Sequence, residues 1–163
     1  MNEGKLFETD FKNSIPPDTY YLRIHDNPQS FNQTDNLRFS PKNPYDALMY
    51  IFPNLFTLEL KTTIGTSFSF NGKTPMIKKH QIEGLDKSSK HKGIISGFIF
   101  NFRKVNKTYF LPIDKFLNYK NSTDKKSINQ KDIIDSGAIE VRGEIKRVRT
   151  KFYIGEFIKK VQE

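Results

Sequence analysis

The segment Pro44-Tyr45-Asp46-Ala47-Leu48-Met49-Tyr50 is followed, after a short break, by Phe56-Thr57-Leu58-Glu59-Leu60-Lys61. The break contains a Pro-Asn turn signal, so the two apolar runs are expected to pair as antiparallel strands. Such pairing would bring Asp46 and Glu59 near each other at one end of a sheet. Glu59 and Lys61 are two residues apart, so on a strand both side chains point to the same face. The stretch therefore predicts a place where two carboxylates and one ammonium group converge.

Two carboxylates and a lysine are the groups that metal-dependent hydrolysis of a phosphodiester needs. Carboxylate oxygens are hard ligands that suit Mg²⁺, with Mn²⁺ as a possible substitute. A lysine ammonium group can steady the attacking water or offset charge that develops on the phosphate. Asp46 and Glu59 are therefore the candidate metal ligands, and Lys61 is a further candidate catalytic residue. This local pattern leaves an ordinary charged hairpin open as the alternative.

A second acid-x-lysine triplet lies further along the chain at Glu144-Ile145-Lys146, with Asp132 and Asp135 upstream. The segment Asp132-Ile133-Ile134-Asp135 has the pattern of one helical turn. The second triplet therefore lacks the preceding strand that the first triplet has. This context favours the first triplet as the site.

The bulk composition favours a polyanionic partner. The chain has 163 residues, enough for one domain with a substantial core. Its formal net charge is +9, from 27 Lys and Arg residues against 18 Asp and Glu residues. Nucleic acid is the first candidate partner for such a surplus, and a lysine-rich surface from an AT-biased genome is the alternative. Cysteine is absent, which excludes disulfides, thiolate zinc sites and cysteine nucleophiles.

The hydropathy pattern predicts no membrane-spanning segment. No apolar segment approaches the ~18–20 residues of a membrane-spanning helix, and the first residues do not resemble a signal peptide. We therefore expect a soluble cytoplasmic protein with no membrane association.

The remaining pattern predicts an α/β fold with a central mixed β-sheet flanked by helices, in a single domain over residues 1–163. Residues 25–43 are polar and rich in turn formers, which predicts a long loop or a protruding short stalk. Residues 142–151 are a basic tail. The expected helices are 4–14, 77–91, 113–119, 127–134 and a final one ending near Val161, and the expected strands are 19–24, 45–52, 55–62, 93–102 and 108–111.

Four blocks of the chain carry a family likeness. They are Gly4-Lys5-Leu6-Phe7-Glu8, then Tyr45-Asp46 with Glu59-Leu60-Lys61, then His80-Gln81-Ile82-Glu83, and finally the 93–102 strand leading into Tyr109-Phe110-Leu111-Pro112-Ile113-Asp114-Lys115-Phe116. In this order they resemble the RecU-type Holliday-junction resolvases, also described as penicillin-binding-protein-related factor A. That family belongs to the PD-(D/E)xK nuclease superfamily. The resemblance covers nearly the whole chain and implies a restriction-endonuclease-like core.

The resemblance also implies roles for individual residues. Asp46 and Glu59 would bind the catalytic Mg²⁺, and Lys61 would support the water and the scissile phosphate. Gln81 would lie beside the metal site on its helix, and Glu8 would be a first-helix acid that completes the site. The enzyme would be a homodimer that cuts branched DNA at four-way junctions by paired nicks, in recombination or repair. A two-fold dimer suits a junction with two equivalent strands. The resemblance further implies a bacterial or phage-encoded protein associated with the nucleoid.

The chain also departs from the family pattern. Pro44 stands where the family commonly has a threonine, and Ala47 stands where a more polar residue is usual. The 25–43 segment, where the cellular enzymes place a stalk, is short and nearly neutral. Two other interpretations therefore stay open. One is a nuclease of the same fold that acts on forks, flaps or duplex DNA, and the other is a DNA-binding module with a decayed nuclease site.

Basic clusters are the candidates for contacts with the DNA backbone. Lys78 and Lys79 rank first because they lie on the same segment as Gln81. Phosphate contacts position a protein on DNA without reading sequence, which suits an enzyme that recognises DNA shape. His80 is interpreted as a phosphate contact or a surface residue. The other basic residues in clusters are Lys87, Lys90, Lys92, Lys120, Lys125, Lys126 and the 142–151 tail.

Overall fold

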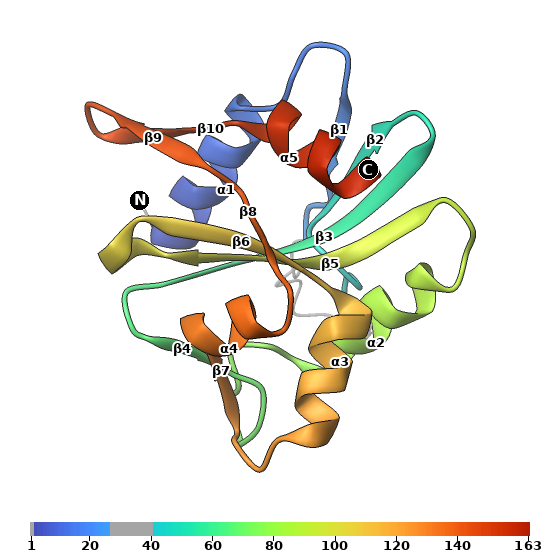
Figure 1. Ribbon diagram of the computed structural model, residues 1–163, viewed down its shortest axis with the longest axis vertical. Coiled ribbons are helices and arrows are strands. Elements are labelled where there is room, and N and C mark those ends of the chain that lie inside the picture. Colours follow the sequence, from blue (N-terminus) through green and yellow to red (C-terminus); the bar gives the residue numbers. More distant parts are fainter. Residues whose placement is uncertain (1, 27–40) are drawn as a thin grey trace, which may run out of the picture.

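A mixed sheet of six strands forms the centre of the molecule (Figure 1). The computed structural model describes residues 2–26 and 41–163, so most of the loop or stalk predicted at 25–43 lies outside the described residues. β3 and β5 run parallel, and the other neighbouring strands of the sheet run antiparallel. The predicted α/β class with a central mixed sheet is confirmed. In spatial order the strands are β1 (Tyr20–Arg23), β2 (Ala47–Ile51), β3 (Asn54–Thr63), β5 (Ile94–Phe102), β6 (Lys107–Pro112) and β8 (Ile139–Glu140).

Helices cover both faces of the sheet (Figure 1). Two small antiparallel ribbons lie outside it, β4 (Ser67–Ser69) with β7 (Ser127–Asn129) and β9 (Gly143–Lys146) with β10 (Arg149–Phe152). No helix within the described residues is long and apolar enough to cross a bilayer. The helices are α1 (Glu3–Asn13), α2 (Lys79–Ser89), α3 (Ile113–Ser122), α4 (Gln130–Asp135) and α5 (Ile154–Gln162), with a 3₁₀ turn, η1 (Arg103–Val105), between β5 and β6.

The helix predicted at 127–134 is wrong in its first three residues. Ser127 to Asn129 form strand β7, in which Ile128 pairs with Phe68 of β4 and is fully buried. Asn129 then caps α4, because its side chain accepts a hydrogen bond from the backbone N–H of Asp132. Pairing with β4 therefore holds Ser127 to Asn129 as a strand despite their helical sequence pattern, and the helix α4 begins only after Asn129.

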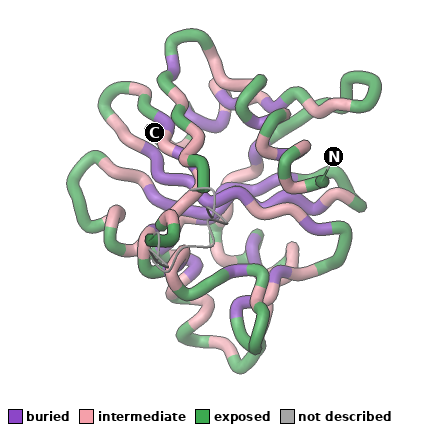
Figure 2. The backbone as a smooth tube through the Cα atoms, turned by 180° about the vertical axis from the view of Figure 1, so that it is seen from behind, coloured by how far each residue is buried: buried purple, intermediate pink, exposed green. Residues whose placement is uncertain are grey.

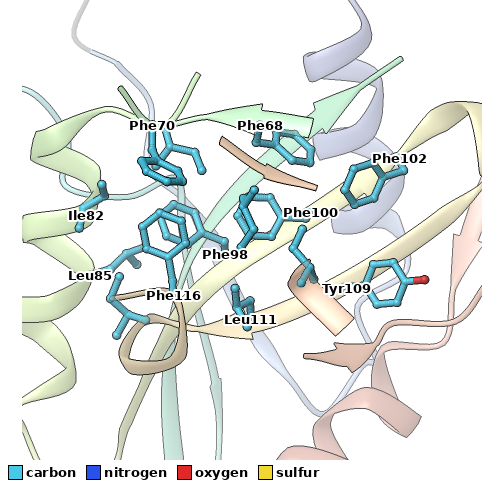
Figure 3. Close-up of a cluster of buried hydrophobic side chains, with 14 residues drawn as sticks. Phe68, Phe70, Ile82, Leu85, Phe98, Phe100, Phe102, Tyr109, Leu111 and Phe116 are labelled. Atoms are coloured by element: carbon cyan, nitrogen blue, oxygen red, sulfur yellow. The ribbon is translucent and has the colours of Figure 1, made fainter. Parts of the chain in front are cut away.

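Two apolar cores lie on opposite faces of the sheet. One core packs α1 and α5 against the sheet through residues such as Phe11, Phe56 and Phe157. The other packs α2, α3 and α4 against it, and its centre is aromatic (Figure 3). β3 and β5 are buried on both faces along much of their length (Figure 2), which explains their nearly continuous apolar sequences. Each fully buried large side chain contributes about 1.5–3 kcal/mol.

A cluster of three hydroxyl groups holds α2 against the two central strands. Thr57 of β3 donates to Ser96 of β5 at 2.7 Å, and Ser88 of α2 lies 2.9 Å from Thr57 Oγ1 and 2.8 Å from Ser96 Oγ. Thr57 and Ser96 are buried, so these hydrogen bonds satisfy groups that would be costly to leave unpaired. The cluster fixes α2 over the strand that carries Glu59.

A glycine lets α2 approach the segment that leads into β2. A Cβ atom added at Gly84 would lie 2.4 Å from Pro44 Cβ and 2.8 Å from the Pro44 carbonyl oxygen. Tyr45, the next residue, packs against the core beneath α2. Pro44, which departs from the family pattern, therefore contacts the helix directly. This contact fixes the chain just before Asp46.

We predict that Gly84→Ala destabilises the fold by about 1–3 kcal/mol, because the added methyl group clashes with the Pro44 backbone. Alanine is favoured over glycine inside a helix by about 1 kcal/mol, so at a helix position without a clash Gly→Ala would increase the free energy of unfolding. Gly155→Ala in α5 is the matched control, since the nearest atom to its added Cβ is Pro16 Cγ at 3.8 Å. Urea unfolding measures both variants. Equal stabilisation of both would contradict the clash.

Candidate active site

Strand register brings Asp46 and Glu59 together. Ala47 pairs with Leu58 in the β2–β3 ladder, so Asp46, one residue earlier, lies opposite Glu59. The Asp46 backbone N–H donates to the Leu58 carbonyl at 3.0 Å. The Asp46 carboxylate in turn accepts the Leu60 N–H through Oδ2 at 2.9 Å. Both the backbone and the carboxylate of Asp46 are therefore held against β3.

Glu59 lies at the centre of the cluster, and its side chain is only 3% exposed. Lys61, two residues along β3, places Nζ 3.0 Å from Glu59 Oε1. Gln81 of α2 donates from Nε2 to the same oxygen at 2.6 Å. The other end of the Gln81 amide, Oε1, accepts the backbone N–H of Lys78 at 2.9 Å. The first turn of α2 thus fixes the position of the Glu59 carboxylate.

Arg23 joins Asp46 to the opposite helix layer. Arg23 Nε donates to Glu8 Oε2 of α1 at 2.8 Å, and one terminal nitrogen donates to the Asp46 carbonyl at 3.0 Å. The other terminal nitrogen lies 3.8 Å from Asp46 Oδ1. Glu8 therefore belongs to the cluster through Arg23.

Arg23 is the site residue that the sequence analysis missed. A signal was present, because Arg23 is the one charged residue in the Thr19–Ile24 run that predicts a strand. Its importance depends on β1 pairing with β2, where Arg23 lies opposite Ala47. That pairing is not visible from the 19–24 segment alone.

A cleft borders the Arg23–Glu8 contact between α1 and β1. Its volume is about 620 Å³, and Lys5, Lys12 and Arg23 are among the residues that line it. The lining also contains two acids, Asp26 and the Glu8 that pairs with Arg23, so the cleft has mixed charge.

Burial makes the two carboxylates unusually basic. Desolvation raises the pKa of Glu59 to about 7, the nearby charge of Asp46 raises it as well, and Lys61 lowers it. Desolvation also raises the pKa of Asp46, against the hydrogen bond from Leu60 and the charge of Arg23. The negative charge of the pair is therefore poorly compensated by the neighbouring groups. A divalent cation would compensate it.

The donor set fits such a cation. Oε2 of Glu59 accepts no hydrogen bond within the described residues, and Asp46 Oδ1 has only the distant Arg23 nitrogen beside it. The part of the chain that the structure describes holds no group of three or more His, Cys, Asp or Glu side chains suited to a metal. Mg²⁺ is commonly held by one or two carboxylates, with water and substrate phosphates completing its shell. Asp46 and Glu59 meet that requirement.

The candidate DNA contacts lie at the start of α2. Lys78 and Lys79 are both exposed, and Lys79 Nζ lies 3.7 Å from Glu83 one turn later. Burial lowers the pKa of His80, as do the charges of Lys42, Lys78 and Lys61. His80 thus lies in a cationic surrounding and forms no part of the carboxylate cluster.

The second acid-x-lysine triplet shows no such convergence. Glu144 and Lys146 lie on the exposed strand β9 and pair with each other at 3.0 Å. Asp132 accepts hydrogen bonds from Tyr119 and Lys125 at the start of α4. These carboxylates are occupied by separate local partners.

Comparison with known proteins identifies the family. Residues 53–150 match the family model described as RecU, recombination protein U, a range that includes Glu59, Lys61 and Gln81 and begins after Asp46. The SPbeta prophage-derived uncharacterized protein YotM of Bacillus subtilis (strain 168) is 35% identical over 179 residues, covering 99% of this chain and 89% of YotM.

A solved structure is also similar. The Archaeoglobus fulgidus Hjc, described as a Holliday junction resolvase from an archaeal hyperthermophile, matches with a TM-score of 0.50 and 11% identity, over 83% of this chain and 90% of that chain. At this identity the likeness concerns the fold alone, and it agrees with the restriction-endonuclease-like core. With the family match over 53–150 and a relative that spans nearly the whole chain, the resemblance found in the sequence is confirmed: the chain belongs to the RecU (recombination protein U) family.

Proposed function

We propose that the protein is a Mg²⁺-dependent endonuclease that resolves four-way DNA junctions by paired nicks. The observation that carries the proposal is the desolvated Asp46–Glu59 pair with Lys61 and Gln81 on Glu59, in a chain of the RecU family. The net charge of +9 supports an anionic substrate. The archaeal structural neighbour is described as a Holliday junction resolvase, which agrees with a junction substrate.

Each polar residue of the site has a distinct part in this proposal. Mg²⁺ held by Asp46 and Glu59 would supply Lewis-acid activation of water and neutralisation of phosphate charge. Lys61, whose Nζ lies 3.0 Å from Glu59, offsets the charge that develops on the phosphorane-like transition state. Gln81 orients the Glu59 carboxylate by its hydrogen bond. Glu8 holds Arg23, and Arg23 holds the Asp46 backbone, so Glu8 acts as a positioning residue.

DNA contacts in this proposal begin at the edge of the site. Lys78 and Lys79 stand at the first turn of α2, three and two positions before Gln81. Their exposed ammonium groups would bind phosphates next to the scissile one and position the strand without reading its sequence.

Removing either carboxylate should abolish cleavage. Asp46→Asn and Glu59→Gln are each expected to lower the cleavage rate by at least about 10³-fold and to spare DNA binding, since loss of even one transition-state donor costs about 10²–10³-fold. The assay compares a mobile four-way junction, linear duplex and single strand, with Mg²⁺, with Mn²⁺ and with EDTA. Asp135→Asn, at an exposed carboxylate upstream of the second acid-x-lysine triplet, is the matched control and should cut at the wild-type rate.

The substrates separate the competing interpretations. Symmetric, metal-dependent nicking of the junction alone supports the resolvase. Equal cutting of linear duplex would keep the nuclease and remove the junction specificity. Binding without cutting in either metal would leave a DNA-binding module with a decayed site.

The proposed metal site should also affect the free energy of unfolding and its dependence on pH. The folded protein raises the pKa of Glu59 from 4.5 to about 7, so it binds this proton more tightly than the unfolded chain does. The resulting stabilisation is complete below pH 4.5 and is lost as the pH rises to about 7. In EDTA at pH 8, Glu59→Gln should therefore be more stable than the wild type by about 3 kcal/mol, and the gap should close near pH 4.5.

Urea unfolding at the two pH values, with EDTA or with Mg²⁺, measures this effect. Mg²⁺ at pH 8 should stabilise the wild type and leave Glu59→Gln unchanged, because a cation bound only to the folded state adds to its stability. A wild type that does not respond to Mg²⁺ or Mn²⁺ would count against Glu59 as a metal ligand.

We also propose that the protein is a homodimer that meets its second copy on the open face of β1 and β2. Tyr20 pairs with Tyr50 and Leu22 pairs with Leu48, so four uncharged side chains share this face. Tyr20, Leu22 and Tyr50 are exposed, and Phe52 just beyond β2 is 79% exposed. Contiguous exposed apolar surface marks interaction sites.

Charge placed on this face should separate the copies. Tyr50→Lys is expected to convert a dimer into a monomer, measured by light scattering after size exclusion, and to replace paired nicks by single nicks. Ile64→Lys adds the same charge at another exposed apolar position, 61% exposed, and should leave the mass unchanged. If the wild type is a monomer, or if Tyr50→Lys is still a dimer, the proposed interface is wrong.

A further inference from the structure

The β9–β10 ribbon stands apart from the central sheet and takes no part in the carboxylate site. Its two antiparallel strands pair only with each other, and the ribbon projects from the body of the molecule (Figure 1). Every residue of β9 is exposed. This ribbon is the structure of the basic tail found at 142–151 in the sequence. Its exposed cationic and apolar side chains, described next, indicate that the ribbon binds a partner.

The ribbon carries more cations than carboxylates: Lys146, Arg147, Arg149 and Lys151 stand against Glu144 and the Asp10 that contacts it. Lys146 pairs with Glu144, and Arg149 pairs with Asp10 of α1. Arg147 and Lys151 have no carboxylate oxygen within 4.0 Å in the described part of the chain. Both are exposed. Lys151 lies opposite Glu144 in the ladder, so it shares that carboxylate with Lys146. The ribbon therefore presents an excess of positive charge, with Arg147 at its tip.

Beside the cation Arg147, the outer end of the ribbon carries exposed apolar side chains. Val148 is 91% exposed and Ile145 is 55% exposed, and Arg147 beside Val148 adopts a left-handed conformation with φ of 60°. A narrow ribbon with exposed apolar side chains and cations at its outer end matches the major groove of duplex DNA. That groove admits a two-stranded ribbon, and its floor exposes thymine methyl groups. Its two walls are lined by phosphates.

The ribbon is fixed to the helix that serves the candidate active site. Asp10 of α1 accepts from Arg149 Nε at 2.5 Å and from the Thr150 N–H at 3.1 Å. Ser14, the C-cap residue of the same helix, accepts the Phe152 N–H at 2.9 Å. Glu8, two residues before Asp10, holds Arg23 beside Asp46. One helix therefore sets the position of the ribbon relative to the carboxylates.

We propose that the β9–β10 ribbon enters the major groove of a DNA duplex arm and holds that arm at a fixed offset from Asp46 and Glu59. Arg147 and Lys151 contact phosphates on the groove walls, so binding is independent of sequence. This inference rests on the proposed function only in taking DNA as the partner. It concerns where the duplex lies, and the chemistry of cleavage does not enter it.

The test is DNA binding by Arg147→Asn/Lys151→Gln, measured as Kd against salt concentration in EDTA with four-way junction and linear duplex. Asparagine tolerates the left-handed conformation at position 147, so the fold is preserved, and thermal unfolding checks this. The slope of log K against log salt should fall by about 2, one unit for each lost phosphate contact. The Kd should rise by about 10-fold or more on both DNAs near 0.1 M salt.

Lys104→Gln/Lys159→Gln is the control, because it removes the same charge from two exposed lysines outside the ribbon. It should change the slope and the Kd much less. Hydroxyl-radical footprinting should show protection on a duplex arm that the ribbon variant loses.

The outcomes separate the two proposals. An unchanged slope and Kd in the ribbon variant, or an equal loss in the control, overturns the ribbon contact whether or not the protein cuts DNA. A wild type that binds but does not cut overturns the nuclease and leaves the ribbon test intact. A wild type that binds no DNA overturns both.

Discussion

The antiparallel pairing of β2 with β3 is the constraint on which the rest of the site depends. This pairing sets Asp46 opposite Glu59 and gives Asp46 two hydrogen bonds to the β3 backbone. It also brings two carboxylates into a desolvated place, where burial raises the pKa of both and the charge of Asp46 further raises the pKa of Glu59. The surrounding residues offset this rise only partly. The sheet thus maintains a local excess of negative charge, around which α2 and β1 are arranged.

The two helix layers contribute to the site from opposite faces of the sheet. From α2, Gln81 reaches Glu59, and the Thr57–Ser88–Ser96 hydroxyl cluster holds the same helix two residues away along β3. From α1, Glu8 reaches Arg23, which binds the Asp46 carbonyl. Each carboxylate is therefore controlled by a different helix.

Much of this arrangement was predictable from local sequence, because the elements that create it are neighbours in the chain. The β2–β3 hairpin spans fewer than twenty residues, and its turn signal and alternation are self-contained. Arg23 was missed because its role depends on β1, which joins the hairpin from across the 27–40 segment. β4 and β7 were missed because each has three residues and finds its partner about sixty residues away. The β9–β10 ribbon escaped prediction because charged residues, which disfavour strands, fill its exposed face.

The contact between Gly84 and Pro44 has a consequence for how this sequence can change. A Cβ at 84 would lie 2.4 Å from the Cβ, 2.8 Å from the carbonyl oxygen and 2.9 Å from the Cα of Pro44. Threonine also has these three atoms, so a change from proline to threonine at 44 makes no room for a side chain at 84. A larger residue at 84 would displace the backbone at 44, and the displacement would pass directly to Asp46 two residues later. Relatives with threonine in place of Pro44 should therefore still have glycine at the Gly84 position.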